Sequence, residues 1–247
     1  MTRYIDVNDL SYLVSQKGLQ TCITEMAEYI RADYLRWNDF EKCARLANHS
    51  PEGVIELMPV SDASLYAFKY VNGHPKNTQS GMLTVMAFGA LGDVDTGKPV
   101  LLSEMTLTTA IRTAATSALV ARYLARDNSR SMALIGNGSQ SEFQALAFHA
   151  MLGITEIRLF DIDAKAMAKL ANNLKAFPAI KVILAGSVAE AVKGADIVTT
   201  VTADLAHPAL VVETLQSPLP TRVNQAGQVV QRARVMVQER TKECLPL

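Results

Sequence analysis

Two glycines and one acidic residue in this sequence have a spacing that suits contact with a phosphorylated ligand. Gly136-Asn137-Gly138 follows the short apolar run Met132 to Ile135, and Asp161 stands 23 residues beyond Gly138 (161 − 138). Glycine lets a backbone turn sharply and approach a pyrophosphate without a Cβ clash. An acid at this distance is placed to accept a hydrogen bond from a ribose 2′-hydroxyl. The spacing therefore indicates a dinucleotide site.

A strand, a helix and a second strand are needed to position these residues. Met132 to Ile135 predicts a buried strand, and Ser139 to Leu152, with Gly153 as its stop, predicts a helix. The free N–H groups and positive dipole end of that helix attract phosphate. Ile157 to Phe160 predicts the next strand, which ends at Asp161.

The glycine pair also has a less specific interpretation, as a loop in some other α/β turn. Ser141 occupies the position of the third glycine in the dinucleotide fingerprint, although serine is small enough to keep helix and strand close. Asp161 favours NAD over NADP, because a carboxylate repels a 2′-phosphate. Arg158 and Lys165 lie near enough in sequence to leave NADP open.

The composition is typical of a cytoplasmic enzyme. The chain has 247 residues, of which 49% are hydrophobic, and 24 basic residues balance 24 acidic ones. The absence of a basic cluster argues against a nucleic-acid partner. No apolar run approaches the ~20 residues of a membrane span, and the N-terminus does not resemble a signal peptide. Cys22, Cys43 and Cys244 have no metal-ligand spacing, so we expect free thiols, a reducing compartment and no metal.

The first half of the chain has a different pattern from the dinucleotide half. Asp6 or Asn8 can cap a first helix, and Thr21 to Phe40 has a helical apolar stripe. Short apolar or alternating segments follow: Arg45 to Asn48, Val54 to Met58, Leu65 to Val71, Leu83 to Ala90 and Pro99 to Leu102. A helix with a small-residue face begins at Thr106. We expect an α/β protein with an N-terminal α+β domain at 1–128 and a Rossmann domain at 129–247.

Four charged residues of the first half could serve a ligand. Arg45, Glu56 and Lys69 lie in apolar neighbourhoods, and a buried charge is tolerated only when it is paired or used. With Arg112 they offer three cations and one carboxylate, which would suit an anionic substrate that also carries an amine. The alternative is that each is a surface charge on an edge strand. His74, between Gly73 and Pro75, is predicted to be a turn residue.

Several longer blocks resemble the ornithine cyclodeaminase/mu-crystallin family, and within it the bacterial ornithine cyclodeaminases. They are FKYVNGHPKNT at 68–78, TVMAFG at 84–89, DVDTG at 93–97, SEMTLTTAIRTAATS at 103–117 and IGNGSQSEFQALAF at 135–148. The resemblance extends to about Asp204. It implies that residues 1–128 are a substrate-binding and dimerisation domain of a homodimer, that residues 129–247 bind an NAD cofactor, and that L-ornithine is the substrate.

The resemblance also implies roles for matched residues. Arg45, Lys69 and Arg112 resemble the family's substrate contacts, and Glu56 resembles the acidic partner near the reacting amines. The residues that resemble cofactor contacts, together with the glycines of the turn, are Thr84, Arg112, Gly136, Gly138, Ser139, Gln140, Asp161 and Thr202. The implied reaction converts ornithine to proline and ammonia, with hydride removed and returned on one bound NAD.

Beyond Asp204 the sequence departs from the family's pattern. Asn224 to Gly227 is similar to the start of the family's Asn-x-x-Gly-Gly-Asp segment, but Gln228 and Val229 follow and the catalytic aspartate has no counterpart. The family continues past the position of Leu247. We therefore expect ornithine turnover to be low. Two alternatives stay open: a catalytically silent NAD-binding relative of the mu-crystallin type, and an NADH-dependent imine or amino-acid dehydrogenase.

Overall fold

The computed structural model describes residues 1–202, 222–223, 229–230 and 235–238, with side chains over 1–202. The chain forms two compact units, Met1–Thr113 and Ala114–Leu247, and the division between them falls inside helix α3, Thr106–Leu124. The domain division that we predict after residue 128 stays a prediction.

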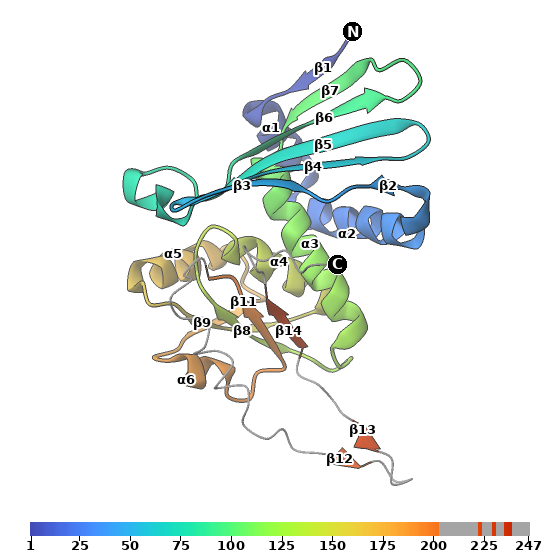
Figure 1. The fold of residues 1–247 in the computed structure, drawn as a ribbon. Helices are drawn as coiled ribbons and strands as arrows, with labels where there is room; N and C mark the ends of the chain where they lie inside the picture. Colours follow the sequence, from blue (N-terminus) through green and yellow to red (C-terminus); the bar gives the residue numbers. More distant parts are fainter. Residues whose placement is uncertain (203–221, 224–228, 231–234, 239–247) are drawn as a thin grey trace. The chain divides into compact units, whose positions relative to one another are not determined.

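The first unit is built on a seven-stranded sheet, shown at the blue to green end of the colour scale in Figure 1. The strand order is β1-β7-β6-β5-β4-β2, and β3 pairs with β4. The strands are β1 Arg3–Ile5, β2 Glu41–Lys42, β3 Leu46–Ser50, β4 Gly53–Ser61, β5 Leu65–Gly73, β6 Ala87–Asp93 and β7 Pro99–Glu104. The helices that precede α3 are α1 Val7–Lys17 and α2 Leu19–Leu35, and the 3₁₀ turns are η1 Trp37–Asp39 and η2 Pro75–Ser80.

The first helix begins at a capping box. The Asp6 side chain accepts from the Asn8 and Asp9 amides, and the Asp9 carboxylate accepts from the Asp6 amide. This confirms Asp6 as the cap, because its carboxylate satisfies amides that have no partner within the helix. The long helix predicted to reach Phe40 ends at Leu35 instead, where the chain continues into η1. Asparagine and aspartate in that turn compete for backbone groups and disfavour a continued helix.

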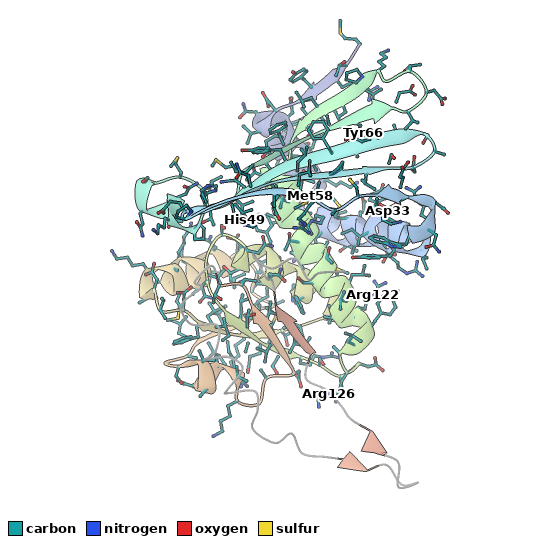
Figure 2. The ribbon with its side chains drawn as sticks, in the orientation of Figure 1. Asp33, His49, Met58, Tyr66, Arg122 and Arg126 are labelled. Atoms are coloured by element: carbon teal, nitrogen blue, oxygen red, sulfur yellow. The ribbon has the colours of Figure 1, made fainter. Side chains whose placement is uncertain are left out.

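The two faces of this sheet differ in chemistry. Val54, Val71 and Ala87 are buried on one face, called here the inner face, and α1 and α2 lie on that side in Figure 1. The opposite face, called the outer face, carries Tyr4, Leu46, Ile55, Leu57, Pro59, Tyr66, Phe68, Tyr70, Phe88, Ala90 and Leu102. Tyr66 is labelled in Figure 2. Alternation along each strand sends these side chains away from the helices.

The strand predicted from Leu83 begins four residues later, at Ala87. The reason is that nearby backbone groups already have other partners. The His74 amide donates to the Thr84 carbonyl, and the Asn72 side chain accepts from the Met86 amide. These bonds hold residues 84–86 as a loop that folds over the end of β5.

The second unit is a five-stranded parallel sheet in the order β10-β9-β8-β11-β14. Its strands are β8 Ser131–Ile135, β9 Glu156–Phe160, β10 Lys181–Leu184, β11 Ile197–Thr200 and β14 Val235–Gln238, while β12 Arg222–Val223 and β13 Val229–Val230 pair separately. The helices after α3 are α4 Ser141–Leu152, α5 Ala164–Leu174 and α6 Val188–Val192. Numbered within the unit, the order is 3-2-1-4-5, that of the doubly wound nucleotide-binding sheet. The predicted fold class is confirmed.

Helices cover both faces of this parallel sheet. In Figure 1, α4 and α5 lie on one face and α6 on the other. Met132, Leu134 and Phe148 are completely buried on the α4 side, and Ala191 and Val192 of α6 pack with the opposite face. Gly153 ends α4 in a left-handed conformation at φ 68°, as the sequence predicts.

An aspartate ties together the starts of two neighbouring strands. The Asp196 carboxylate, just before β11, accepts from the Arg130 amide at 2.9 Å, the Ser131 amide at 3.0 Å and the Ser131 hydroxyl at 2.9 Å. It also pairs with Arg126, which Figure 2 labels beyond the end of α3. Burial alone would raise the pKa of Asp196, but these hydrogen bonds outweigh it and lower the pKa.

Candidate functional sites

The glycine turn lies where the strand order of the parallel sheet reverses. Gly136 has φ 89°, and its amide donates to the Phe160 carbonyl at 2.9 Å. A Cβ on Gly136 would lie 2.9 Å from both the Thr202 nitrogen and the Val201 carbonyl carbon. The turn after β8 therefore lies directly against the segment after β11. In open α/β sheets, ligands bind beyond the carboxyl ends of the strands at such a reversal.

The second glycine of the turn, Gly138, has a different environment. A Cβ there would meet no heavy atom within 4 Å, and its φ is not positive. Ser141, at the third-glycine position, is buried and donates its hydroxyl to the Gly138 carbonyl at 2.6 Å. Helix α4 begins at Ser141, two residues later than predicted, so the exposed Ser139 and half-buried Gln140 lie in the turn before it. The backbone at Gly138 is thus open to an approaching phosphate.

Asp161 closes the far side of the turn. One carboxylate oxygen accepts from the Asn137 amide at 2.5 Å and the other from the Asp163 amide at 2.9 Å. Each oxygen keeps a further lone pair, so the half-buried carboxylate can still accept from a ribose hydroxyl. Sequence reasoning missed the bond between Asn137 and Asp161, because no local pattern reports a contact between two turns.

Buried polar atoms next to the turn are compatible with a bound nucleotide. The Asn137 side-chain oxygen and the Thr200 hydroxyl are buried and have no hydrogen-bond partner among the described residues. A buried acceptor or donor without a partner costs about 1–3 kcal/mol, so a polar group supplied from outside would be stabilised there. The residues present therefore fit a dinucleotide.

Four predicted substrate residues gather in the first unit. Arg45 and Glu56 form an ion pair of 3.0 Å, in which the Glu56 side chain is only 18% exposed and that of Arg45 is 50% exposed. Lys69 of β5 lies opposite Met58 of β4, so Lys69 and Glu56 share the inner face. Because Glu56 is paired and mostly buried, it is not an ordinary exposed charge on an edge strand. Arg45 directly precedes β3, so the strand that we predict from Arg45 begins one residue later, at Leu46.

The ionisation of Lys69 reflects its surroundings. Burial, followed by the nearby charges of Arg112 and Arg45, lowers the pKa of the Lys69 ammonium to about 8, although Glu56 acts in the opposite direction. Arg112 is the seventh residue of α3, in its second turn, so the dipole at the helix N-terminus adds little to its electrostatics. Its exposed guanidinium belongs to the charged cluster through its effect on Lys69.

The remaining predicted contacts have simpler surroundings. Thr84 is half-buried in the loop after η2, and its carbonyl accepts from the His74 amide at 2.9 Å. His74 directly precedes η2, with its ring nitrogen 3.2 Å from the Asn72 amide group, which agrees with a turn role. Thr202 is exposed beyond β11, against Gly136. The cofactor contacts expected of Thr84, Arg112 and Thr202 stay predictions.

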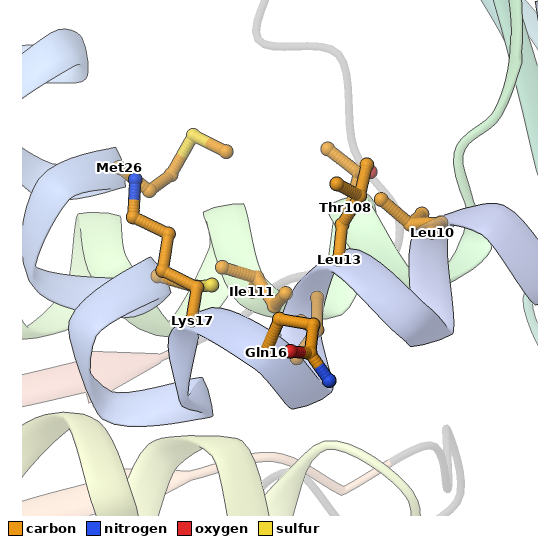
Figure 3. A pocket seen from close by; sticks show the side chains of 9 residues that line it. Leu10, Leu13, Gln16, Lys17, Met26, Thr108 and Ile111 are labelled. Carbon is orange, nitrogen blue, oxygen red and sulfur yellow. The ribbon is translucent and has the colours of Figure 1, made fainter.

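An apolar hollow in the first unit contains none of the predicted residues. Figure 3 shows this hollow of about 570 Å³, which α1, α2 and the first turns of α3 line. Its lining residues are Leu10, Leu13, Val14, Gln16, Lys17, Cys22, Met26, Thr108 and Ile111. Lys17 pairs with Glu25 at its margin. Lys17 is the one charged residue in this lining and is already paired, so the lining offers no carboxylate for a substrate amine.

Some expectations fall outside these two sites. The segment from Asn224 to Val229, where the sequence departs from the family's aspartate motif, belongs to a stretch with no described side chains. Over the described part of the chain, no group of three or more His, Cys, Asp or Glu residues could hold a metal ion. No helix among the described residues has the length and apolar character needed to cross a membrane.

The fold and the glycine turn define a doubly wound nucleotide-binding protein with a separate N-terminal α+β unit. Its sequence matches the ornithine cyclodeaminase/mu-crystallin family over residues 8–218. The chain belongs to this family.

Individual relatives agree with this assignment. An ornithine cyclodeaminase of Agrobacterium tumefaciens is 60% identical over 201 residues, covering 81% of this chain and 56% of the relative. A lysine cyclodeaminase, studied for recognition of L-lysine, L-ornithine and L-2,4-diaminobutyric acid, aligns with a TM-score of 0.76 at 27% identity, over 84% of this chain and 62% of the other. An archaeal alanine dehydrogenase dimer with bound NAD aligns with a TM-score of 0.69 at 27% identity, over 81% and 60%. The chain thus spans less than two thirds of the length of these relatives.

Proposed function

We propose that this protein is an ornithine cyclodeaminase, which converts L-ornithine to L-proline and ammonia. The observation that carries the proposal is the 60% identity to an ornithine cyclodeaminase over most of the chain. The cluster of Arg45, Glu56, Lys69 and Arg112 supports it, because a carboxylate and two amines are the groups that such a cluster can hold.

The cofactor of this proposal is NAD. The open backbone at Gly138 and the close approach at Gly136 suit a pyrophosphate, and Asp161 suits a ribose. Ser139 and Gln140 lie in the turn before α4, where further contacts with phosphate are available. NAD, when bound, supplies a hydride acceptor and donor. Thr84, Arg112 and Thr202 complete the proposed cofactor contacts.

The substrate contacts follow from charge and geometry. The guanidinium groups of Arg45 and Arg112 carry permanent charge and can each donate two parallel hydrogen bonds to a carboxylate. Lys69 adds a third donor on the same face. Glu56, paired with Arg45, suits an ammonium group of ornithine and is the proposed acid–base residue near the amines.

A homodimer formed through the outer face is part of the proposal. Tyr4 is 73% exposed, Leu46 67%, and Tyr66 and Phe88 43% each. Phe88 stacks on Tyr70 with ring centroids 5.0 Å apart, so the aromatic residues form a continuous patch rather than scattered side chains. Exposed patches of this kind mark association surfaces, and a second copy offers the same apolar chemistry. The structurally similar alanine dehydrogenase is also a dimer.

The environment of the protein is also part of the proposal. We place it in the cytoplasm, without nucleic-acid or membrane partners. Cys22 and Cys43 are free thiols, which agrees with a reducing compartment. The balance of 24 basic and 24 acidic residues offers no strong field for a polyanion.

The test is the release of proline and ammonia from L-ornithine by the full chain, with catalytic NAD⁺ and no added NADH. Glu56→Gln, which keeps the shape but does not titrate, should lower the rate by ~10²–10⁴. NAD⁺ binding without any product would favour the silent relative. NADH consumption in step with reduction of an added imine would favour the dehydrogenase.

A further inference from the structure

We propose that Lys69 is the proton acceptor for the α-ammonium group of the bound substrate, rather than a third permanent cation for its carboxylate. The proposal rests on the proposed function and assigns a chemical role within that site. It follows from the position of Lys69, from the charges around it and from the chemistry that ornithine requires.

The position of Lys69 leaves the residue half-buried and partly shields it from bulk water. The side chain lies on the inner face between Met58 of β4 and Gly89 of β6. A Cβ on Gly89 would lie 2.3 Å from the Met105 sulfur, so Met105 fills the space above that glycine. Val71, the next residue on the same face, is buried. Lys69 therefore has apolar neighbours along its strand and across it.

The charges that face Lys69 favour its neutral form. The nearby charged groups are Arg45 before β3, Glu56 of β4 and Arg112 of α3. Glu56 is already compensated by Arg45 at 3.0 Å, and no hydrogen bond or ion pair joins Lys69 to any described residue. Two guanidinium groups therefore oppose the protonation of Lys69, and the one carboxylate that favours it is already paired.

Lysine also has the chemistry that this role requires. Arginine keeps its proton under all ordinary conditions, whereas the pKa of a buried lysine shifts readily. Burial and the two guanidinium groups lower the pKa of Lys69 to about 8, close to the pH at which a proton acceptor works best. Arg45 and Arg112 are then the permanent cations of the site, and Lys69 is the titrating one.

The step itself is a balanced proton transfer. Ornithine enters with its α-nitrogen as an ammonium group, which has no lone pair to form a C=N bond. The neutral Lys69 amine takes one proton from this ammonium. The products are a lysine ammonium and a neutral α-amine, with no change in oxidation state. The new positive charge on Lys69 then lies beside the substrate carboxylate, which stabilises the pair.

The first experiment measures the ionisation of Lys69 directly in the ligand-free full chain. Lysine labelled with ¹³C at Cε reports the charge of its amine by NMR, and Lys69→Arg identifies the Lys69 signal. We expect a midpoint near pH 8 for this signal alone. A midpoint above about 10, the ordinary value for lysine, would overturn the proposal.

The second experiment measures proton exchange on binding, by calorimetry at pH 8 in buffers of different ionisation enthalpy and without added NAD. 5-Aminopentanoate has a carboxylate but no α-amine, so about half a proton should be taken up from the buffer. With ornithine, Lys69 and the α-amine share one proton in the complex, whereas the free groups carry about one and a half at pH 8, so about half a proton should be released to the buffer. Equal uptake by both ligands would show that Lys69 only pairs with the carboxylate. Lys69→Arg should show no uptake with either ligand.

These outcomes separate the inference from the proposed function. Failure of the protein to bind ornithine at all would refute both ideas. Binding of ornithine, with Lys69 fully charged at pH 9, would refute only the role of Lys69. Where turnover is measurable, Lys69→Arg should lower kcat by ~10²–10⁴ with little change in KM, because it keeps the cation and loses the acceptor.

Discussion

The two glycines of the turn predict opposite effects for the same substitution. Gly136→Ala places a methyl group against the backbone of Val201 and Thr202, 2.9 Å away, at φ 89°. Gly138→Ala places a methyl group in open space at an ordinary φ. The first should destabilise the protein, whereas the second should leave the fold intact and obstruct only the ligand.

The magnitudes follow from these surroundings. A non-glycine residue in the left-handed region costs about 1–2 kcal/mol. Overpacking against atoms that must move adds about 1–3 kcal/mol. Gly136→Ala should therefore lower the free energy of unfolding by about 2–5 kcal/mol. Gly138→Ala should change it by less than about 0.5 kcal/mol, as is usual for a surface site, but weaken NAD binding at least about tenfold, or 1.4 kcal/mol.

Urea denaturation measures the first effect, and isothermal titration with NAD⁺ measures the second. The two variants control for each other, since they place the same methyl group two residues apart. An unaltered NAD affinity in Gly138→Ala would show that no pyrophosphate approaches this backbone. An unaltered stability in Gly136→Ala would refute the contact between the turn and the segment after β11.

Three further predictions follow from other parts of the structure. Asp196→Ala should lower stability at pH 7 by about 1–3 kcal/mol, because it strips partners from the Arg130 and Ser131 amides. Since the pKa of Asp196 is lowered in the fold, chemical denaturation should show the difference from wild type shrinking below about pH 4. The pKa of Lys69 is lowered to about 8 in the folded protein, so the free energy of unfolding should rise between about pH 8 and 10. The rise should be at most about 1.4 kcal/mol per pH unit before solvent screening. Chemical denaturation should show this slope in the wild type and not in Lys69→Met. Phe88→Asp should yield monomers in sedimentation, whereas Tyr12→Asp, at a more exposed aromatic residue of α1, should not; equal mass for both variants would exclude the outer face as the dimer contact.

Sequence reasoning was most accurate where the signal is local. The predicted strand Met132 to Ile135, the helix stop at Gly153 and the strand ending before Asp161 agree with β8, α4 and β9 to within two residues. An apolar run and a glycine that must adopt a left-handed conformation are properties of a few consecutive residues. Local physics is therefore sufficient there.

The prediction errors arise where contacts between residues distant in the sequence determine the local structure. Leu83 to Ala90 has the alternation of a strand, but hydrogen bonds from His74 and to Asn72 hold its first part as a loop. The sequence likewise does not reveal that one face of the first sheet carries exposed apolar side chains. Which face of a strand meets the helices depends on the register of all its neighbours, and composition does not contain that information.

The Asp196 hydrogen bonds join β8 and β11 at the start of these strands more strongly than strand pairing alone would. The Asp196 carboxylate joins the starts of β8 and β11, in addition to the strand pairing. At their far ends the Val201 amide donates to the Ile135 carbonyl at 2.8 Å, and Gly136 packs against Thr202. The amide hydrogen of Ser131 should therefore exchange with solvent far more slowly than that of Gly138 in the open turn. The contacts that hold the strand starts together thus lie at the opposite end of the sheet from the turn that would meet a ligand, so ligand recognition and folding stability can change separately.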